Sequence, residues 1–281
     1  MKKIIVAIDF SKTSLNALEY ALMIAGKAGA DVLMAWVDNT VSDESMYEGS
    51  PAEERKEKVN LFKEIQAEFK DRLPNNKIEY KTKRGKVYTE IANLAKAVDC
   101  DLIIAGTHGV SGFEEFWIGS NAYRIVTHTP VPVITLRLDF KPGEIKRIVL
   151  PIDSSQETRQ KVPFATQMAS LFNSEIHVLS LYTTNFKSVK KRVDNYAEQA
   201  VNFIRERKIR YKTKALESDN VTKTTIEYST GVNADLIAIM TEQETTTANL
   251  FLGPYAQQMV NHSPIPILSV RSKELVPIPV K

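Results

Sequence analysis

The sequence predicts two tandem α/β domains, each a doubly wound parallel sheet of five strands with helices on both faces. Three observations support this fold class. Short β-branched runs alternate with amphipathic helical segments along the chain. The whole scheme occurs twice, as an internal repeat. A turn-like segment at 141–144 separates the copies, so we expect domains at 1–138 and 145–271, followed by a tail at 272–281.

Five strands and four helices are expected in the first domain. Apolar β-branched runs are typical of strands buried on both faces of a parallel sheet. The strands are expected at 4–8, 31–37, 78–83, 102–105 and 131–136. Leucines at steps of three and four residues mark the first helix, which we expect Gly29 to end. A charged helix after the polar loop 38–51 is expected to bury Val59, Phe62, Ile65 and Phe69.

The second domain repeats this order. Its strands are expected at 148–152, 175–181, 210–215, 236–240 and 265–270. Its charged helix keeps a stripe of Val193, Tyr196, Ala200 and Phe203. Right-handed crossovers leave few strand orders, and the flavodoxin-like order 3-2-1-4-5 is the one we expect. In that order ligands bind at the carboxyl ends of the strands, where Asp9, Val37 and Gly106 lie.

Composition and charge are those of an ordinary globular protein. The 281 residues carry 37 Lys and Arg against 34 Asp and Glu, a net charge of +3, which by itself predicts neither nucleic-acid nor membrane binding. The basic run from Arg205 to Arg210 is expected to be a solvated helix end. The single cysteine, Cys100, excludes an intrachain disulfide and is expected to be a small buried residue.

The sequence also carries a prediction about location. The first residues, Met1-Lys2-Lys3, lead directly into a strand, without the apolar segment and cleavage site of a signal peptide. No apolar run approaches the ~20 residues of a transmembrane helix. We therefore expect a cytoplasmic protein.

Glycines cluster between the fourth strand and the last helix of the first domain. Gly106 and Gly109 allow the backbone to approach a ligand closely, and Gly119 and Ser120 open a helix. The amino end of a helix presents unpaired N–H groups and a partial positive charge, so it attracts phosphate. A turn followed by a helix cap is the alternative explanation.

This loop resembles a known motif. Its pattern G-2x-G-9x-G-S, from Gly106 to Ser120, is similar to the ATP-binding motif of the universal stress protein family. The strand-Asp-x-Ser opening at Asp9 and the phrases DLIIAGTHG and TPVPVITLR resemble that family as well. The resemblance covers nearly all of 1–137 and, more weakly, 145–271, as in a tandem universal stress protein.

The resemblance implies that the first domain binds ATP, with Mg²⁺ held mainly through the phosphates. Asp9 would lie near the ribose and the metal, Val37 would meet adenine through its backbone, and the glycine loop would hold the phosphates. The nucleotide-binding residues would be Ala7, Ile8, Asp9, Val37, Ala105, Gly106, His108, Gly109, Gly119, Ser120 and Asn121. Two alternatives stay open from the residues alone: Asp9 as a helix cap and His108 as a loop residue facing solvent.

The second domain departs from the motif. Met240, Glu242, Gln243 and Pro254 stand at the places of Gly106, His108, Gly109 and Ser120. Bulky side chains block a close approach, a carboxylate repels phosphate, and proline removes an N–H group. We therefore predict that this half does not bind ATP in the same way. The resemblance also implies an intramolecular pseudo-dimer in which the fifth strands pair, while a homodimer of whole chains stays open.

Three functions remain to be weighed. The leading hypothesis is an ATP-binding stress-response or signalling protein, whose loop 110–118 carries Phe113, Phe116 and Trp117. The second is a nucleotide-independent module that binds another protein. The third is a weak ATPase, although the sequence offers no nucleophile–base constellation, no evident general base and no histidine pair with metal-ligand spacing.

Overall fold

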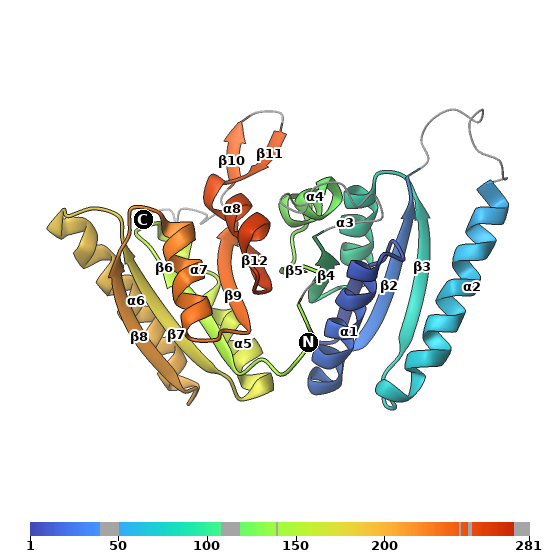
Figure 1. Cartoon of the computed structure of the whole chain (residues 1–281), viewed down its shortest axis with the longest axis horizontal. Helices are drawn as coiled ribbons and strands as arrows, with labels where there is room; N and C mark the ends of the chain where they lie inside the picture. Colours follow the sequence, from blue (N-terminus) through green and yellow to red (C-terminus); the bar gives the residue numbers. More distant parts are fainter. Residues whose placement is uncertain (40–50, 108–118, 139, 242, 247–248, 273–281) are drawn as a thin grey trace, which may run out of the picture. The chain divides into compact units, whose positions relative to one another are not determined.

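The chain divides into two compact units. A computed structural model describes residues 1–39, 51–107, 119–138, 140–241, 243–246 and 249–272. One unit comprises residues 1–144 with 259–268, and the other comprises 145–258 with the chain from 269 onward. Figure 1 shows the strands and helices of each unit in the order of the sequence.

The first domain contains the predicted doubly wound sheet. Its strands are all parallel and lie in the order β3-β2-β1-β4-β5, which confirms the predicted order. Its elements are β1 (Lys3–Ala7), α1 (Lys12–Ala28), β2 (Asp31–Asp38), α2 (Pro51–Phe69), the 3-10 turn η1 (Lys70–Arg72), β3 (Ile78–Arg84), α3 (Val87–Ala97), β4 (Leu102–Gly106), α4 (Ser120–His128) and β5 (Val133–Leu136).

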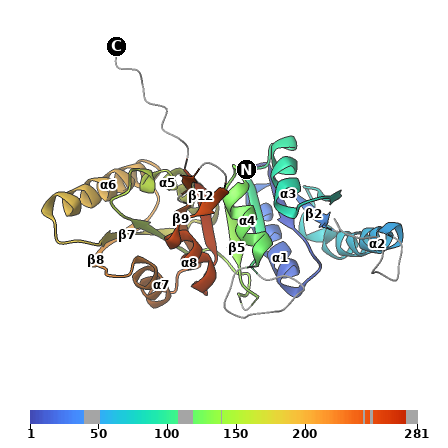
Figure 2. The same ribbon diagram turned by 90° about the horizontal axis from the view of Figure 1, so that it is seen from above.

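Helices cover both faces of this sheet. Helices α1 and α2 lie on one face, and α3 and α4 lie on the other (Figure 2). The central strands are therefore shielded on both sides, and Ile4, Ile5 and Val6 of β1 have no exposed surface. The amino ends of α1 and α4 follow the carboxyl ends of β1 and β4, so two helix amino ends meet the same edge of the sheet.

Helix α1 shows how local sequence sets these elements. The Ser11 hydroxyl caps its first turn by accepting a hydrogen bond from the Ser14 backbone N–H at 3.2 Å. Gly29 ends it in a left-handed conformation with φ of 63°, as predicted. Between the caps, apolar residues at helical spacing pack on β1 and β4, and Leu18 and Ala21 are completely buried.

The second domain repeats the topology. Its five strands lie in the order β8-β7-β6-β9-β12, again 3-2-1-4-5 within the domain, and β6, β7, β8 and β9 are parallel. Its elements are β6 (Arg147–Ile152), the 3-10 turn η2 (Gln156–Arg159), α5 (Val162–Phe172), β7 (Glu175–Tyr182), α6 (Lys187–Glu206), β8 (Tyr211–Glu217), α7 (Val221–Gly231), β9 (Leu236–Thr241), β10 (Gln243–Thr246), β11 (Asn249–Leu252), α8 (Pro254–His262) and β12 (Ile267–Arg271). The antiparallel hairpin of β10 and β11, which stands where the first domain has its glycine loop, was not predicted.

The structure corrects two details of the prediction. Strand β5 begins at Val133 rather than Val131, since Pro130 and Pro132 cannot donate ladder hydrogen bonds. Of the four residues expected on the buried side of α2, only Phe62 is fully buried, because this outer helix covers the edge of the sheet. The predicted pairing of the fifth strands and the pseudo-dimer stay predictions.

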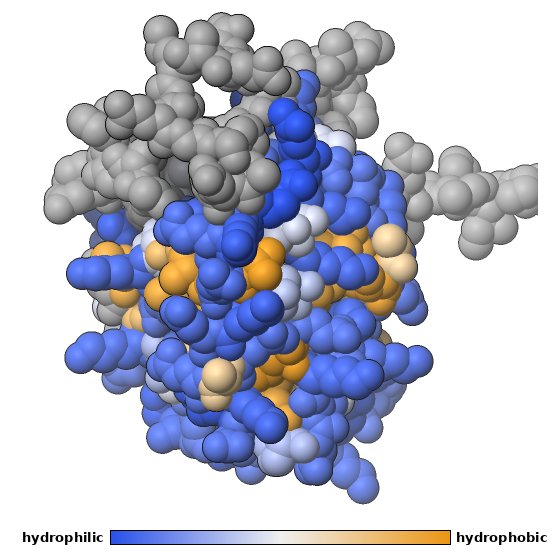
Figure 3. Space-filling view, turned by 90° about the vertical axis from the view of Figure 1, so that its right-hand side faces the viewer, coloured by the Kyte–Doolittle hydropathy of each residue, from blue (hydrophilic) through white to orange (hydrophobic). Residues whose placement is uncertain are grey.

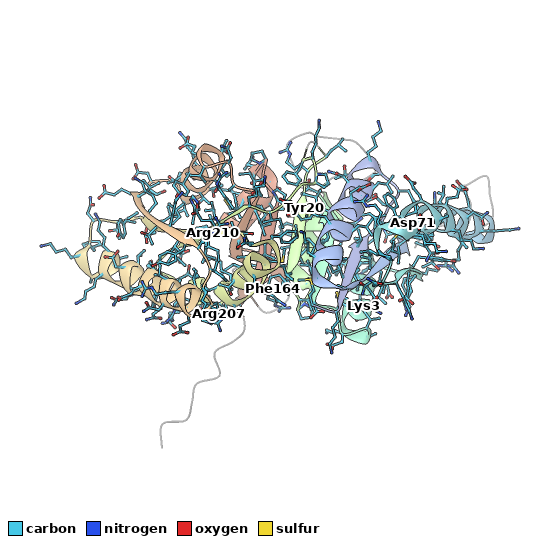
Figure 4. The ribbon with its side chains drawn as sticks, turned by 90° about the horizontal axis from the view of Figure 1, so that it is seen from below. Lys3, Tyr20, Asp71, Phe164, Arg207 and Arg210 are labelled. Carbon is cyan, nitrogen blue, oxygen red and sulfur yellow. The ribbon has the colours of Figure 1, made fainter. Side chains whose placement is uncertain are left out.

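Two expectations about single side chains are confirmed. Cys100 is 5% exposed, and burial raises the pKa of its thiol to about 11, so this thiol is not reactive. The basic run ends α6, with Arg205 in the last turn. Figure 4 labels Arg207 at this end of the helix. The Arg207 guanidinium stacks on Phe203, 3.3 Å from the ring centroid. These arginines are held by neighbouring aromatic rings at a solvated helix end.

Candidate functional site

A cavity of about 230 Å³ opens at the carboxyl edge of the first sheet. It lies where β1 and β4 end and their connections leave toward opposite faces, which is the switch point of a doubly wound sheet. The lining residues are Ala7, Ile8, Asp9, Ser14, Ala35, Trp36, Val37, Asn39, Val87, Ala105, Gly106, Thr107, Gly119, Ser120, Asn121, Ala122 and Ile125.

Three alanines in register form the floor of the cavity. Ala7 of β1 pairs with Ala35 of β2 on one side and with Ala105 of β4 on the other. Residues paired in a parallel sheet share a face, so the three methyl groups line up across the strands. Because no side chain here extends beyond Cβ, space remains between the sheet and the residues Val87 of α3 and Ile125 of α4. The result is an apolar slot at the end of the sheet.

The amino end of α4 forms the polar rim. Gly119 is the N-cap residue, with φ of −55° and ψ of 140°, and no side chain caps the helix there. Ser120 and Asn121 follow in the first turn, which contains no acidic residue. The backbone N–H groups of a first helical turn have no partner within the helix, so this rim is suited to an anion.

Asp9 shapes the turn between β1 and α1. Its Oδ1 accepts hydrogen bonds from the Ser11 backbone N–H at 3.0 Å and from the Ser11 hydroxyl at 2.5 Å. Its own N–H donates to the Ser14 hydroxyl at 3.3 Å. Asp153 makes the same two bonds to Ser155 in the second domain. The aspartate therefore has a structural role in both domains, and in the first it also lines the cavity.

Gly106 is required by packing as well as by any ligand. A Cβ at this position would lie 2.6 Å from Cγ2 and 3.1 Å from the backbone carbon of Thr13. The missing side chain therefore lets α1 approach the end of β4. This packing role was not anticipated from the sequence.

The cavity gathers most of the residues singled out in the sequence. Of the eleven, nine line it, and His108 and Gly109 lie outside the described residues. The lining residues missed by the sequence analysis are Ser14, Ala35, Trp36, Asn39, Val87, Thr107, Ala122 and Ile125. The register of small residues across β1, β2 and β4 could have signalled the floor, but only once the strand order was known.

The second domain fills the corresponding place. Pro151 stands at the position of Ala7 and pairs with Leu179, which stands at the position of Ala35. Continuing the register of β6 with β9 by two residues places Ile239 opposite Pro151 on the other side. Leu179 and Ile239 have no exposed surface. Three larger side chains thus occupy the level that the alanines leave open.

The helix start has changed as well. Met240 takes the place of Gly106, the residue that lets α1 approach β4 in the first domain. The chain after β6 forms the 3-10 turn η2, and α5 begins only at Val162. Between this turn and α5 lies a buried ammonium group, that of the α5 N-cap residue Lys161, which is 2% exposed. It donates to the Thr158 carbonyl at 2.8 Å and to the Thr158 hydroxyl at 3.1 Å. Burial lowers its pKa to about 8, although the nearby Asp153 acts in the opposite direction.

Comparison with known proteins identifies the family. The model of the universal stress protein family matches residues 1–137 and again 144–271. The chain belongs to the universal stress protein family. A universal stress protein of Methanocaldococcus jannaschii is 32% identical over 143 residues, which is 48% of this chain and 82% of that relative. The two matches confirm the tandem arrangement.

Solved structures support the two-domain fold. A universal stress protein from Archaeoglobus fulgidus superposes with a TM-score of 0.74 at 17% identity, covering 96% of this chain and 98% of its own. A functionally unknown protein from Pseudomonas aeruginosa gives 0.68 at 16% identity, covering 97% and 93%. At such identities the likeness concerns the fold alone.

Neither a metal-binding cluster nor a membrane-spanning helix is found among the described residues. No three or more His, Cys, Asp or Glu side chains within them are grouped so as to hold a metal ion. None of the helices in the same residues is long and apolar enough to cross a membrane.

Proposed function

We propose that the first domain of this universal stress protein binds an adenine nucleotide, ATP with Mg²⁺. The observation that carries this proposal is the cavity itself, which joins an apolar slot to the open amino end of a helix. A nucleotide has the matching chemistry, with a flat apolar base at one end and phosphates at the other. Helix amino ends are common phosphate sites.

The residues can be assigned to parts of the ligand. The slot over Ala7, Ala35 and Ala105 would take the base, with Val87 and Ile125 on its open face. Asp9 would lie by the ribose. The phosphates would meet the α4 backbone at Ser120 and Asn121, together with the predicted His108 and Gly109.

The side chains of the cavity would hold a magnesium ion only together with the nucleotide phosphates. Asp9 is the one acidic side chain among the described lining residues, and one of its oxygens already accepts two hydrogen bonds within its turn. Mg²⁺ is commonly bound through one or two carboxylates plus substrate phosphates. When bound, it would neutralise phosphate charge.

We favour binding over turnover as the activity of this site. Among the described lining residues only Asp9 has an ionisable side chain, and its turn occupies one of its oxygens. A general base must be free to accept a proton within hydrogen-bond reach of the attacking group. We therefore propose a stress-response or signalling role in which the nucleotide is a ligand, with hydrolysis slow at most.

The second domain is proposed to be a partner of the first without a nucleotide site. Its equivalent slot is occupied by Pro151, Leu179 and Ile239. The alternative function, a protein-interaction module that needs no nucleotide, would apply only if the first domain also fails to bind a nucleotide.

Titration calorimetry with Mg-ATP tests the proposal. The protein is compared with a Gly109→Gln, Ser120→Pro double variant, which copies Gln243 and Pro254 of the second domain. We expect one site per chain that the variant lacks. Absence of binding in the unaltered protein would refute the proposal and favour the interaction module, and two sites per chain would contradict the account of the second domain.

A further inference from the structure

Phe10, between Asp9 and Ser11, has an unusual backbone conformation. Its φ is 63°, in the left-handed region. For a bulky residue this region is unfavourable, because Cβ comes too close to the backbone carbonyl. Such conformations persist only where surrounding structure enforces them, and they often occur at functional sites. Phe10 directly follows Asp9, a residue that lines the cavity.

The turn itself does not require this conformation. In the second domain Ser154 takes the place of Phe10, between an aspartate and a serine that make the same two hydrogen bonds. The described non-glycine residues with positive φ are Phe10, Asp99, Asn173, Lys208 and Asn233, so Ser154 has an ordinary φ. At this position of the turn, the left-handed conformation therefore occurs in the first domain and not in the second.

Contacts of the Phe10 ring explain what holds it. Its centroid lies 4.9 Å from that of Phe62 on α2, at an interplanar angle of 57°, and the Lys58 ammonium lies 5.4 Å from it. Phe62 is completely buried and stacks on Tyr80 of β3 at 5.0 Å and 6°. Packing against α2 thus compensates for the strained backbone, and the ring joins the turn at the cavity to this helix.

A second link joins α2 to the same edge. Asp38 ends β2, next to Val37 of the cavity, and its carboxylate lies 3.7 Å from the Arg55 guanidinium. Asp38 is 5% exposed. Helix α2 thus contacts two residues that each neighbour a lining residue of the cavity in the sequence, Phe10 and Asp38. Its far side belongs to the outward face of the first domain, which is mainly hydrophilic (Figure 3).

We propose that Phe10 couples the Asp9 turn to α2, so that a ligand in the cavity alters the stability of that helix. The part played by the ligand rests on the proposed function; the coupling between turn and helix does not. Because Phe10 is part of the turn, a shift of the turn displaces the Phe10 ring. The ring must then either move α2 with it or lose its contact with Phe62. The charged outer face of α2 would then report occupancy of the cavity to a partner.

The coupling is tested first without ligand, by hydrogen–deuterium exchange of the full chain. Ser11→Ala removes a hydroxyl bonded to Asp9 and so loosens the turn. Phe10→Gly adopts the same φ without strain and lacks the ring, so it preserves the turn and removes the link. Exchange in residues 55–69 of α2 is compared with exchange in α3, which corrects for any general loss of stability.

We expect Ser11→Ala to speed exchange in α2 relative to α3 by about threefold or more, and to have no such effect in the Phe10→Gly background. Ser154→Gly, at the equivalent place in the second domain, is the matched control and should leave this behaviour unchanged. An equal effect of Ser11→Ala in both backgrounds, or no effect in either, would overturn the coupling.

The second arm adds Mg-ATP and measures binding by calorimetry on the same samples. We expect slower α2 exchange in the unaltered protein, whereas Phe10→Gly should bind Mg-ATP without slowing α2. Equal slowing in both would overturn the role of Phe10. Absence of binding heat in the unaltered protein would refute the proposed function alone, since the first arm still decides the coupling.

Discussion

At the scale of single residues, side-chain size decides how much space the carboxyl end of each sheet leaves open. Ala7, Ala35 and Ala105 leave a slot at the end of the first sheet. Pro151, Leu179 and Ile239 close the same level in the second. The glycine motif draws attention in the sequence, yet the three alanines determine how much space the end of the sheet leaves.

Filling the slot should abolish binding. We expect Ala35→Leu with Ala105→Ile, which copies the second domain, to weaken Mg-ATP binding at least ~100-fold, since about 3 kcal/mol corresponds to such a factor. The fold should persist, because the new side chains enter space that is open. Calorimetry measures the affinity and thermal unfolding the stability. The control Leu179→Ala should lower stability without changing affinity; unchanged affinity in the double variant would contradict the assignment of the slot.

Lys161 should destabilise the native state at neutral pH. Burial lowers its pKa to about 8 in the folded chain, below its ordinary 10.5, so the unfolded chain binds this proton more tightly. Stability therefore rises as pH increases from about 8 to about 10.5. We expect Lys161→Met to raise the free energy of unfolding by roughly 1–3 kcal/mol at pH 7. Denaturant unfolding should show a larger gain at pH 7 than at pH 10. A lower free energy of unfolding of Lys161→Met at pH 7 would refute the prediction.

At the scale of elements, helix ends carry much of the local information. Helix α1 begins at a serine cap, ends at a left-handed glycine and packs against β4 through the gap that Gly106 provides. The second domain lacks that gap, and a 3-10 turn precedes its helix. A single position on a strand is thus associated with a different start of the helix packed on it.

Gly26 within α1 and Gly29 at its C-cap should respond oppositely to replacement by alanine. Gly29→Ala places a side chain at φ of 63° and should cost about 1 kcal/mol. Gly26→Ala lies within the helix, where the new Cβ would meet Leu73 at an ordinary 3.7 Å, and should stabilise by about 0.5–1 kcal/mol. Denaturant unfolding of both variants makes the comparison. A gain in stability from Gly29→Ala would contradict the cap, and a loss from Gly26→Ala would contradict the account of the helix interior.

At the scale of the whole molecule, the two domains share a topology and differ in their sites. Both have the order 3-2-1-4-5 and the same aspartate turn. We expect the first domain to bind a nucleotide and the second to bind none. In the second domain the ammonium group of Lys161 lies near Asp153. The repeat therefore separates what the fold needs from what the ligand needs.

This division predicts where nucleotide stabilises the chain. At a Mg-ATP concentration 100 times Kd, binding should stabilise the first domain by about 2.7 kcal/mol. Hydrogen exchange should slow in β1 and β4 and remain unchanged in β6 and β9. Equal slowing in both sets of strands would contradict a single site in the first domain.

The sequence by itself determined the tandem repeat, the alternation of strands and helices, the strand order and nine residues of the cavity. Local periodicity, the handedness of crossovers and a motif of fixed spacing predict these features. Each of these patterns lies within one continuous segment of the sequence. Gly29 is an example, because the glycine that adopts the left-handed conformation at the end of α1 is itself the sequence signal for that end. The erosion of the motif in the second half was visible for the same reason.

Only the tertiary structure decided the rest. The alanine floor depends on the register of three strands that are distant in sequence, and alanines within apolar runs carry no signal of their own. The left-handed Phe10, the burial of Lys161 and the Gly106–Thr13 contact likewise depend on what packs opposite each residue. Packing partners come from other elements, so a pattern confined to one element cannot specify them.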